Sequence, residues 1–197
     1  MEAIYSFDFS VFQFVEEYIW NPVLDVIMTV ITTLGDGGLI WIACAICLLA
    51  TKKYRKVGAM VAAGLIISLA VTDGVLKPLI DRPRPFNYEG WLGQFNFPEL
   101  VEKPTSVSFP SGHTSSSFAA AVPMLLKSKK RIGIPAIILA ALVAFSRIYV
   151  HVHYCTDVLA GLVMGIIYGL LAVLVVEKLA PMIIKKIKER KAAKNVA

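Results

Sequence analysis

Apolar residues fill this chain in six runs, which short polar or basic stretches separate. Such runs predict helices. Several are shorter than the roughly 20 residues that a full membrane crossing requires, so neighbouring turns would have to extend them. The helices are expected at about 22–34, 39–50, 57–76, 113–126, 132–150 and 156–179.

The segments before and between these runs also carry recognisable patterns. Residues 8–19 mix aromatic and acidic side chains, which is typical of a helix lying at the membrane interface. Asn21 and Pro22 suit the N-cap and first position of the next helix, and the Gly-Asp-Gly-Gly stretch at 35–38 predicts a turn. Residues 81–110 are too irregular to cross a bilayer, and a loop of that length is usually functional.

The composition places the chain in the membrane class. Of its 197 residues, 57% are hydrophobic and 17% charged, and its mean hydropathy of +0.68 is too high for an ordinary soluble domain. We predict one domain over residues 1–197, an all-α polytopic membrane protein with a bundle of six transmembrane helices. It would comprise an interfacial helix at 8–19, a motif core at 73–161 and a basic tail at 185–197. No cleaved signal peptide is expected.

The net charge of +6 comes mainly from basic residues at the ends of apolar runs. Four Lys and Arg lie at 52–56, four at 127–131 and seven from Lys178 onward. Six crossings would put all of these on one side, which the positive-inside rule makes cytoplasmic together with both termini. This placement indicates membrane topology and argues against nucleic acid as a partner.

One short stretch, residues 146–157, gathers an arginine, two histidines and a carboxylate near the opposite face. His153 and Asp157 are four residues apart, so on a helix they share a face. A carboxylate in that place can hold one imidazole nitrogen as a donor and leave the other to attack. Arg147 adds a forked cation that suits a phosphate.

Three stretches would meet at that face if the helices alternate. In the first stretch, six residues separate Lys77 from Arg84-Pro85. The second is Pro110-Ser-Gly-His113. In the third, five residues separate Ser146-Arg147 from His153, and three more separate His153 from Asp157. Together they resemble the three signature motifs of the type 2 phosphatidic acid phosphatase family, which includes lipid phosphate phosphatases and is related to vanadium haloperoxidases. The resemblance covers about half of the chain, from the third to the sixth helix.

The residue types fit a phosphate-binding site. A phosphoryl group in transfer spreads charge over its equatorial oxygens, so catalysis depends on positioned cations and donors. Lys77, Arg84 and Arg147 would supply the cations. Ser111 and Gly112 precede a helix, whose backbone N–H groups and dipole favour an anion.

The resemblance also implies the catalytic roles. His153 would attack phosphorus and carry a phosphohistidine, and Asp157 would orient it. His113 would protonate the leaving oxygen and later activate water. Neither a metal nor another cofactor is expected, because three side-chain cations could replace a divalent ion.

The charged residues have structural interpretations as well. Lys77 could extend from its helix end to the headgroups. Arg84 and Arg147 could form structural ion pairs with Asp81 or Asp73, although intramembrane charges are functional by default. No firm role is predicted for Asp73, which lies within the third apolar run.

Other residues are interpreted as structural. His113 could be a hydrogen-bonded core histidine. His151 competes with His153 as nucleophile, but Cys155 rather than a carboxylate stands four residues after it, which favours a bystander at the interface. Arg82 is interpreted as a solvated loop charge. Glycines at 161, 165 and 169 indicate close helix packing.

We therefore predict an integral membrane phosphatase that acts on a lipid phosphate at the outer face, with the extracytoplasmic loops forming the site. Undecaprenyl diphosphate is the first choice of substrate, because the chain resembles small bacterial members acting on it. Phosphatidate and phosphatidylglycerophosphate are alternatives, as are a lipid phosphotransferase and a non-catalytic lipid-phosphate binder or transporter. Substrate and membrane lipids are the expected partners; the sequence does not indicate an oligomeric state.

Overall fold

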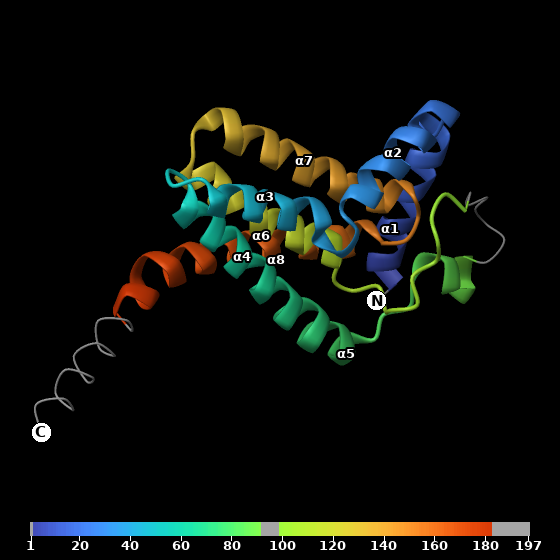
Figure 1. Cartoon of the computed structure of the whole chain (residues 1–197). Coiled ribbons are helices and arrows are strands. Elements are labelled where there is room, and N and C mark those ends of the chain that lie inside the picture. The colour runs from blue at the N-terminus through green and yellow to red at the C-terminus, as the bar shows by residue number, and fades with distance from the viewer. Residues whose placement is uncertain (1, 92–98, 183–197) are drawn as a thin grey trace, which may run out of the picture.

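A computed structural model describes residues 2–91 and 99–182 of the chain. Within this described part every regular element is helical and none is a strand, which confirms the all-α prediction. Figure 1 shows the longer helices gathered side by side in a bundle, with the N-terminal helices at one end of it. The basic tail predicted at 185–197 lies outside the described residues.

Two helices precede the bundle. Helix α1 spans Glu2–Phe14 and continues through a π-helical turn, Val15–Ile19. Helix α2 spans Pro22–Leu34. Asn21 caps it as predicted, because its side-chain oxygen accepts hydrogen bonds from the backbone N–H groups of the second and third residues that follow.

Helix α1 is packed against the rest of the protein. Asp8 and Phe12, which lie one helical turn apart, are both fully buried. Tyr5 stacks on Tyr88 with ring centroids 4.4 Å apart. The helix predicted at 8–19 therefore exists but begins earlier, and its location at the membrane interface is not confirmed.

A glycine-rich corner joins α2 to α3. A 3-10 turn, Asp36–Gly38, leads directly into α3, Leu39–Ala50. Gly37 and Gly38 have φ angles of 57° and 70°, which favour glycine. The predicted turn is confirmed, and it bends the two helices by 47°.

The next helical segment changes character along its length. Helix α4, Arg55–Ser68, continues as a π-helix over Leu69–Leu76 and ends in the single turn α5, Lys77–Ile80. Asp81 ends the helix in a left-handed conformation with a φ angle of 43°. Short 3-10 turns follow at Pro85–Asn87 and Glu89–Trp91.

Three further helices complete the bundle. They are α6, Gly112–Lys127; α7, Lys130–Tyr149; and α8, Cys155–Leu174, which a π-helical turn, Val175–Leu179, extends. Helix α6 is the central one, since it packs against α4, α7 and α8. Three successive alanines of α6, at 119–121, are fully buried.

Glycines let α8 approach α6 closely, as the sequence predicted. A Cβ atom built on Gly161 would lie 2.7 Å from the backbone oxygen of Ser111, and one on Gly165 would lie 2.6 Å from that of Ser115. A Cβ on Gly169 would also collide with α6. Only glycine therefore fits at these positions on α8 without a shift of α6.

Substituting alanine for Gly165 should destabilise the protein. The new methyl group would force α6 and α8 apart, and overpacking of this kind costs about 1–3 kcal/mol. Thermal unfolding of purified protein in detergent should show a lower midpoint for Gly165→Ala. Gly74→Ala is a matched control, because the nearest atom to its added Cβ would be 3.9 Å away. Equal midpoints for both variants would contradict the packing argument.

The helices that could cross a membrane number fewer than predicted. In the described part, three segments are long and apolar enough: Arg55–Asn87, Lys130–Tyr149 and Cys155–Met182. The bent pair α2 and α3 makes a fourth if it counts as one span. Six separate crossings are therefore not confirmed, while the chain remains a multi-pass membrane protein.

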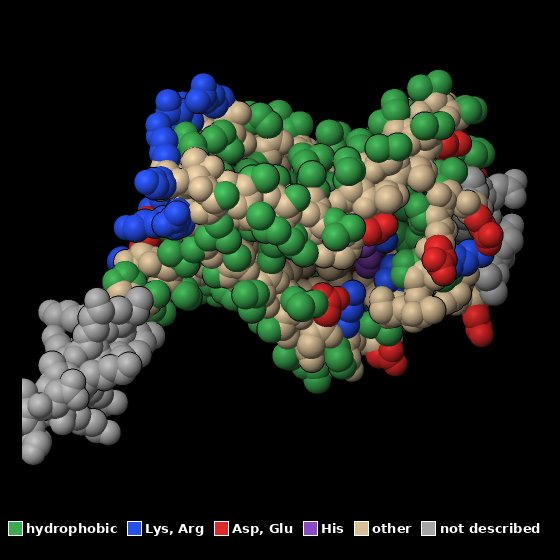
Figure 2. Space-filling model, viewed as in Figure 1, with side chains coloured by type: hydrophobic (Ala, Val, Ile, Leu, Met, Phe, Trp, Pro, Cys, Tyr) green, Lys and Arg blue, Asp and Glu red, His purple; other side chains and the backbone are tan. Residues whose placement is uncertain are grey.

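The two ends of the bundle differ in charge. Figure 2 shows Lys and Arg side chains gathered at one end, over the turns that follow α3 and α6, and apolar side chains over the flanks. The end of α8 lies beside this basic end, because Glu177 pairs with Lys127. Helix α1 lies at the other end (Figure 1). The expectation that both termini are cytoplasmic stays a prediction, because the structure contains no membrane.

Candidate active site

A tight reversal of the chain between α7 and α8 brings the residues of the third motif together. The backbone N–H groups of Val152 and His153 both donate to the carbonyl of Arg147, each at 3.3 Å. His151 has a positive φ angle of 55°, which permits the reversal. Arg147 lies in the last turn of α7, Asp157 lies in the first turn of α8, and His153 lies between the two helices.

His153 lies between a carboxylate and a guanidinium group. Its Nδ1 is 3.4 Å from Oδ2 of Asp157, and its Nε2 is 3.3 Å from Nη1 of Arg84. The imidazole is 2% exposed, so it is almost fully desolvated. Burial, followed by the charges of Arg84 and Arg147, holds the pKa of His153 well below its ordinary value. These surroundings therefore favour the neutral ring, which keeps a lone pair.

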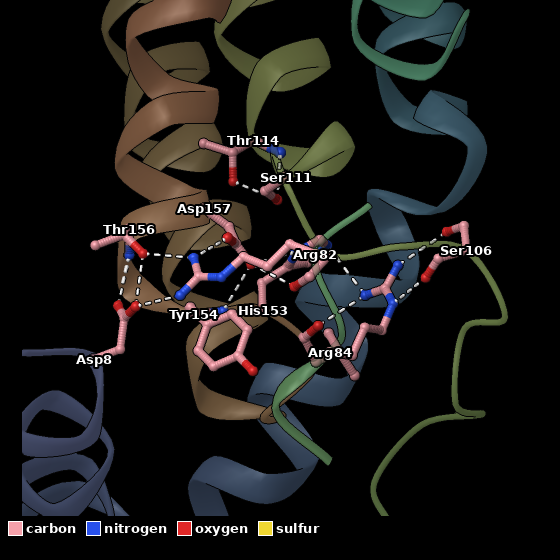
Figure 3. Close-up of polar contacts among 12 residues, drawn as sticks. Asp8, Arg82, Arg84, Ser106, Ser111, Thr114, His153, Tyr154, Thr156 and Asp157 are labelled. Carbon is pink, nitrogen blue, oxygen red and sulfur yellow. Dashed lines mark hydrogen bonds and ion pairs between the residues drawn. The ribbon is translucent and has the colours of Figure 1, made fainter. Parts of the chain in front are cut away.

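Asp157 is held from several sides, as Figure 3 shows. The Ser108 hydroxyl and the backbone N–H of Tyr154, the latter at 3.1 Å, donate to its Oδ2. Arg82 donates to its Oδ1 at 2.6 Å. The carboxylate is fully buried, and these donors fix its orientation toward His153.

Arg82 is not a solvated loop charge, so that interpretation was wrong. Its side chain is 11% exposed and bridges Asp157 to Asp8 of α1, which lies 2.8 Å away. It also lies over the ring of Tyr154 with its guanidinium carbon 3.8 Å from the centroid. Thr156 completes the network by donating to Asp8 through its N–H at 2.9 Å and its hydroxyl at 2.7 Å (Figure 3).

Arg84 is fixed by the chain around it. Its Nε donates to the carbonyl of Ser106 at 2.6 Å, its Nη2 to the hydroxyl of the same residue, and its Nη1 to the carbonyl of Val152 at 2.8 Å. These contacts hold the guanidinium against His153. A structural ion pair with Asp81 or Asp73 is not among the contacts that the structure gives it.

Arg147 keeps part of its hydrogen-bonding capacity free. It is 3% exposed, and its Nη1 donates to the hydroxyl of Thr32 on α2. Among the described residues, its Nε has no hydrogen-bond partner. A buried guanidinium that is paired in this incomplete way suits an anion that arrives from outside.

Lys77 pairs with Asp73, which lies one turn before it, at 2.6 Å. The sequence left Asp73 without a role. Both residues face the start of α6, because a Cβ on Gly112 would lie 3.4 Å from Nζ of Lys77 and from Oδ1 of Asp73. Ser111 caps α6 by accepting from Thr114 and is fully buried.

His113 has a carboxylate partner that the sequence did not reveal. Its Nε2 lies 2.7 Å from Oδ1 of Asp36 in the corner between α2 and α3. The imidazole is 20% exposed, so it is not a buried core histidine.

The predicted site residues converge. The pKa of His153 responds to Arg84, Arg147, His113 and Lys77, which come from separate segments of the chain. Lys77, Gly112 and His113 line one end of a cavity of about 510 Å³. Ser111 joins the two groups, because its backbone N–H donates to the carbonyl of Asp157 at 3.1 Å. The arrangement brings a candidate nucleophile, a candidate acid–base group and three cations to one end of the bundle.

His151 does not take part in this convergence. Its ring is 3% exposed and lies 5.1 Å from the ring of Phe12 on α1. Burial lowers its pKa to about 4. The prediction that it is a bystander is consistent with this position, and its location at the membrane interface stays a prediction.

Sequence reasoning missed several residues that support the site. Asp8, Arg82, Asp36 and Thr32 each contact a motif residue or its partner. The sequence did contain a signal for Asp8 and Asp36, because placing an acidic residue within or beside an apolar helix costs free energy unless the residue is paired. No spacing relation connected them to the motifs.

Comparison with known proteins agrees with this geometry. The PAP2 superfamily pattern matches residues 54–181. An undecaprenyl-diphosphatase of Sulfolobus acidocaldarius is 38% identical over 151 residues, which are 76% of this chain and 68% of the relative. Undecaprenyl-diphosphatase BcrC of Bacillus subtilis is 36% identical over 155 residues, 77% of this chain and 74% of the relative.

Two crystal structures have the same fold. Aquifex aeolicus LpxE matches with a TM-score of 0.71 and 26% identity, over 83% of this chain and 93% of that one. A phosphatidylglycerolphosphate phosphatase of Bacillus subtilis matches with a TM-score of 0.68 and 30% identity, over 87% and 85%. The family pattern, the relatives and the shared fold agree, and the chain therefore belongs to the PAP2 superfamily and is a multi-pass membrane phosphatase of that family.

Proposed function

We propose that this protein hydrolyses a lipid phosphate or diphosphate through a phosphohistidine intermediate. The placement of His153 carries the proposal. Its Nδ1 faces Asp157, which would keep the proton on that nitrogen, and its Nε2 faces Arg84, which would also hold a phosphate oxygen. A binding protein would need the cations but not a histidine oriented in this way.

Each residue has a defined task in the proposed reaction. Nε2 of His153 bonds to phosphorus while the bond to the leaving oxygen breaks, and His113 gives that oxygen a proton. Arg84, Arg147 and Lys77 balance the charge on the equatorial oxygens. His113 then takes a proton from water as the water oxygen attacks phosphorus and the phosphorus–nitrogen bond breaks.

The cavity beside the site supports a lipid substrate. Its polar end holds Lys77 and His113, and apolar side chains of α3 and α4 line the rest, among them Ile42, Ile46 and Leu65. A volume of about 510 Å³ lies within the range of known ligand pockets. The headgroup phosphate would meet the cations while the adjoining hydrocarbon lies between the two helices.

Undecaprenyl diphosphate is the proposed substrate, because two relatives at 36–38% identity carry that activity in their names. Phosphatidylglycerophosphate is a second candidate, since a Bacillus subtilis phosphatidylglycerophosphatase B is 33% identical. The basic end of the bundle would face the cytoplasm by the positive-inside rule, which puts the site and α1 at the outer face.

A phosphate-release assay on purified protein tests the function. Undecaprenyl diphosphate, phosphatidate and phosphatidylglycerophosphate are compared at equal concentration in one detergent. We expect release from all three and the highest kcat/KM for the diphosphate. Release that requires a second lipid or a sugar as acceptor would instead identify a phosphotransferase. No release from any of the three would overturn the proposal.

Phosphate release should continue in excess EDTA. The proposed pocket neutralises the phosphate with side-chain cations, of which Arg84 and Arg147 are buried, so removal of divalent ions should leave the rate nearly unchanged. The measurement compares initial rates in EDTA with rates in added Mg²⁺. Complete dependence on Mg²⁺ would contradict a pocket built on side-chain cations.

A further inference from the structure

The corner between α2 and α3 contributes directly to the candidate site. We infer that Asp36 is a positioning residue for His113, which holds the imidazole in place and favours its protonated form for proton donation to the leaving oxygen. This inference rests on the proposed function. It adds a residue from outside the region 54–181 that the family pattern matches.

The local geometry is specific to this pairing. Oδ1 of Asp36 lies 2.7 Å from Nε2 of His113, although 77 residues separate them along the chain. The positive φ angles of Gly37 and Gly38 set the path of the corner. Gly35 lets the imidazole approach, because a Cβ there would lie 3.0 Å from its Cδ2.

The charges around His113 explain why it needs a carboxylate. Burial opposes a positive charge on the ring most strongly, and Arg147 and Lys77 oppose it as well. The position of His113 in the first turn of α6, where the helix dipole is positive, acts in the same direction. Asp73 lines the same cavity, but its carboxylate is paired with Lys77. The carboxylate of Asp36 favours the charged ring that donation requires.

The pairing also assigns the two nitrogens. With Nε2–H donating to Asp36, Nδ1–H is the group left for the substrate. Its proton passes to the ester oxygen as the phosphorus–oxygen bond breaks and Nε2 of His153 bonds to phosphorus. In the second step the same Nδ1 takes the proton of the attacking water.

A second contact ties this corner to the site independently. Thr32, in the last turn of α2, is fully buried and accepts a hydrogen bond from Nη1 of Arg147. The same helix end therefore positions a phosphate-binding cation and, through Asp36, the proton donor. A displacement of the corner would move both.

Leaving-group dependence provides the test. A proton donor matters greatly when an alkoxide departs and little when a nitrophenolate departs, because the nitrophenolate is stable without a proton. The variant Asp36→Asn is compared with wild type by kcat/KM on a long-chain alkyl phosphate and on para-nitrophenyl phosphate. The ratio kcat/KM reports the steps up to release of the alcohol, so hydrolysis of the intermediate does not affect it.

We expect Asp36→Asn to lose about 10- to 100-fold on the alkyl phosphate and less than about threefold on the aryl phosphate. Asp36→Glu should recover part of the loss on the alkyl phosphate, because it restores the charge. Asp25→Asn is the matched control, since it removes an acidic side chain from the same helix pair at a position that contacts Trp20 and Tyr149. It should leave the ratio between the two substrates unchanged.

The outcomes separate this inference from the proposed function. Equal losses on the two substrates would show a structural role, and no loss on either would show that Asp36 is dispensable; both results overturn the inference alone. Wild-type protein that releases phosphate from neither substrate, nor from the lipids above, would overturn the proposed function and the inference with it.

Discussion

Replacing His153 with alanine should abolish phosphate release from every substrate. The imidazole, buried between Asp157 and Arg84, is the nucleophile that we propose, and water would have no comparable position beside the phosphate. Loss of a nucleophile of this kind lowers kcat by about 10⁴-fold or more. Release of inorganic phosphate from a lipid substrate measures the loss. Acid-labile labelling of the protein by a ³²P-substrate should disappear in parallel.

The matched control for this experiment is His151→Asn. Asparagine tolerates the left-handed backbone that His151 adopts, so the reversal between α7 and α8 is preserved. The substitution removes a ring that packs on Phe12 of α1. Most of the activity should remain. Equal losses in the two variants would defeat the assignment of the nucleophile.

Asp157→Asn should have the second largest effect. The carboxylate accepts from Ser108, Tyr154 and Arg82 and faces Nδ1 of His153, so its surroundings consist of donors. An amide would bring two further N–H donors into this group and could not hold the proton on Nδ1. A wrong tautomer in a comparable triad costs about 10⁴-fold, and we expect a loss of about 10²- to 10⁴-fold in kcat here.

Ser108→Ala is the control for Asp157→Asn. It removes one donor to the same carboxylate and leaves the charge, the N–H of Tyr154 and Arg82 in place, so the loss should be much smaller. Size-exclusion profiles of both variants check that the fold is kept. An Asp157→Asn variant with more than a tenth of wild-type kcat would contradict an orienting role.

The motif residues could be predicted because their spacing along the chain is fixed by short-range structure. Ser146 to Asp157 covers one helix end, one reversal and one helix start, and residues 110–113 form a helix start with its cap. The helix at Asn21 could be predicted for the same reason. Helix caps, helix ends and short reversals depend on residues that are close together in the sequence, so they can be predicted from it.

The supporting residues could not be predicted in this way. Arg82 meets Asp157 across 75 residues, and Asp8 meets Thr156 across 148. Neither pairing follows from a helical period. The first depends on how the segment after α5 packs against α8, and the second on how α1 packs against α8. The sequence therefore suggested a loop charge at Arg82, although its side chain is largely buried and pairs with two carboxylates.

The number of membrane crossings could not be predicted from the apolar runs alone. Apolar runs of 13 and 12 residues are separated by the glycines at 35, 37 and 38, and the sequence alone suggested two short spans. Two of these glycines have positive φ angles in the corner between the bent helices, and the pair is long enough for a crossing only when it is counted as one span. Glycine permits either outcome, because it lacks a preferred backbone conformation.

The attachment of α1 through Asp8 suggests a route to selective inhibitors. A compound or antibody fragment that separates α1 from α8 would leave Arg82 and Thr156 without their partner, and breaking one side of a buried ion pair costs about 3–5 kcal/mol. Arg82 would then hold Asp157 less firmly. An agent of this kind would slow turnover without imitating a phosphate, so accumulating substrate would not displace it.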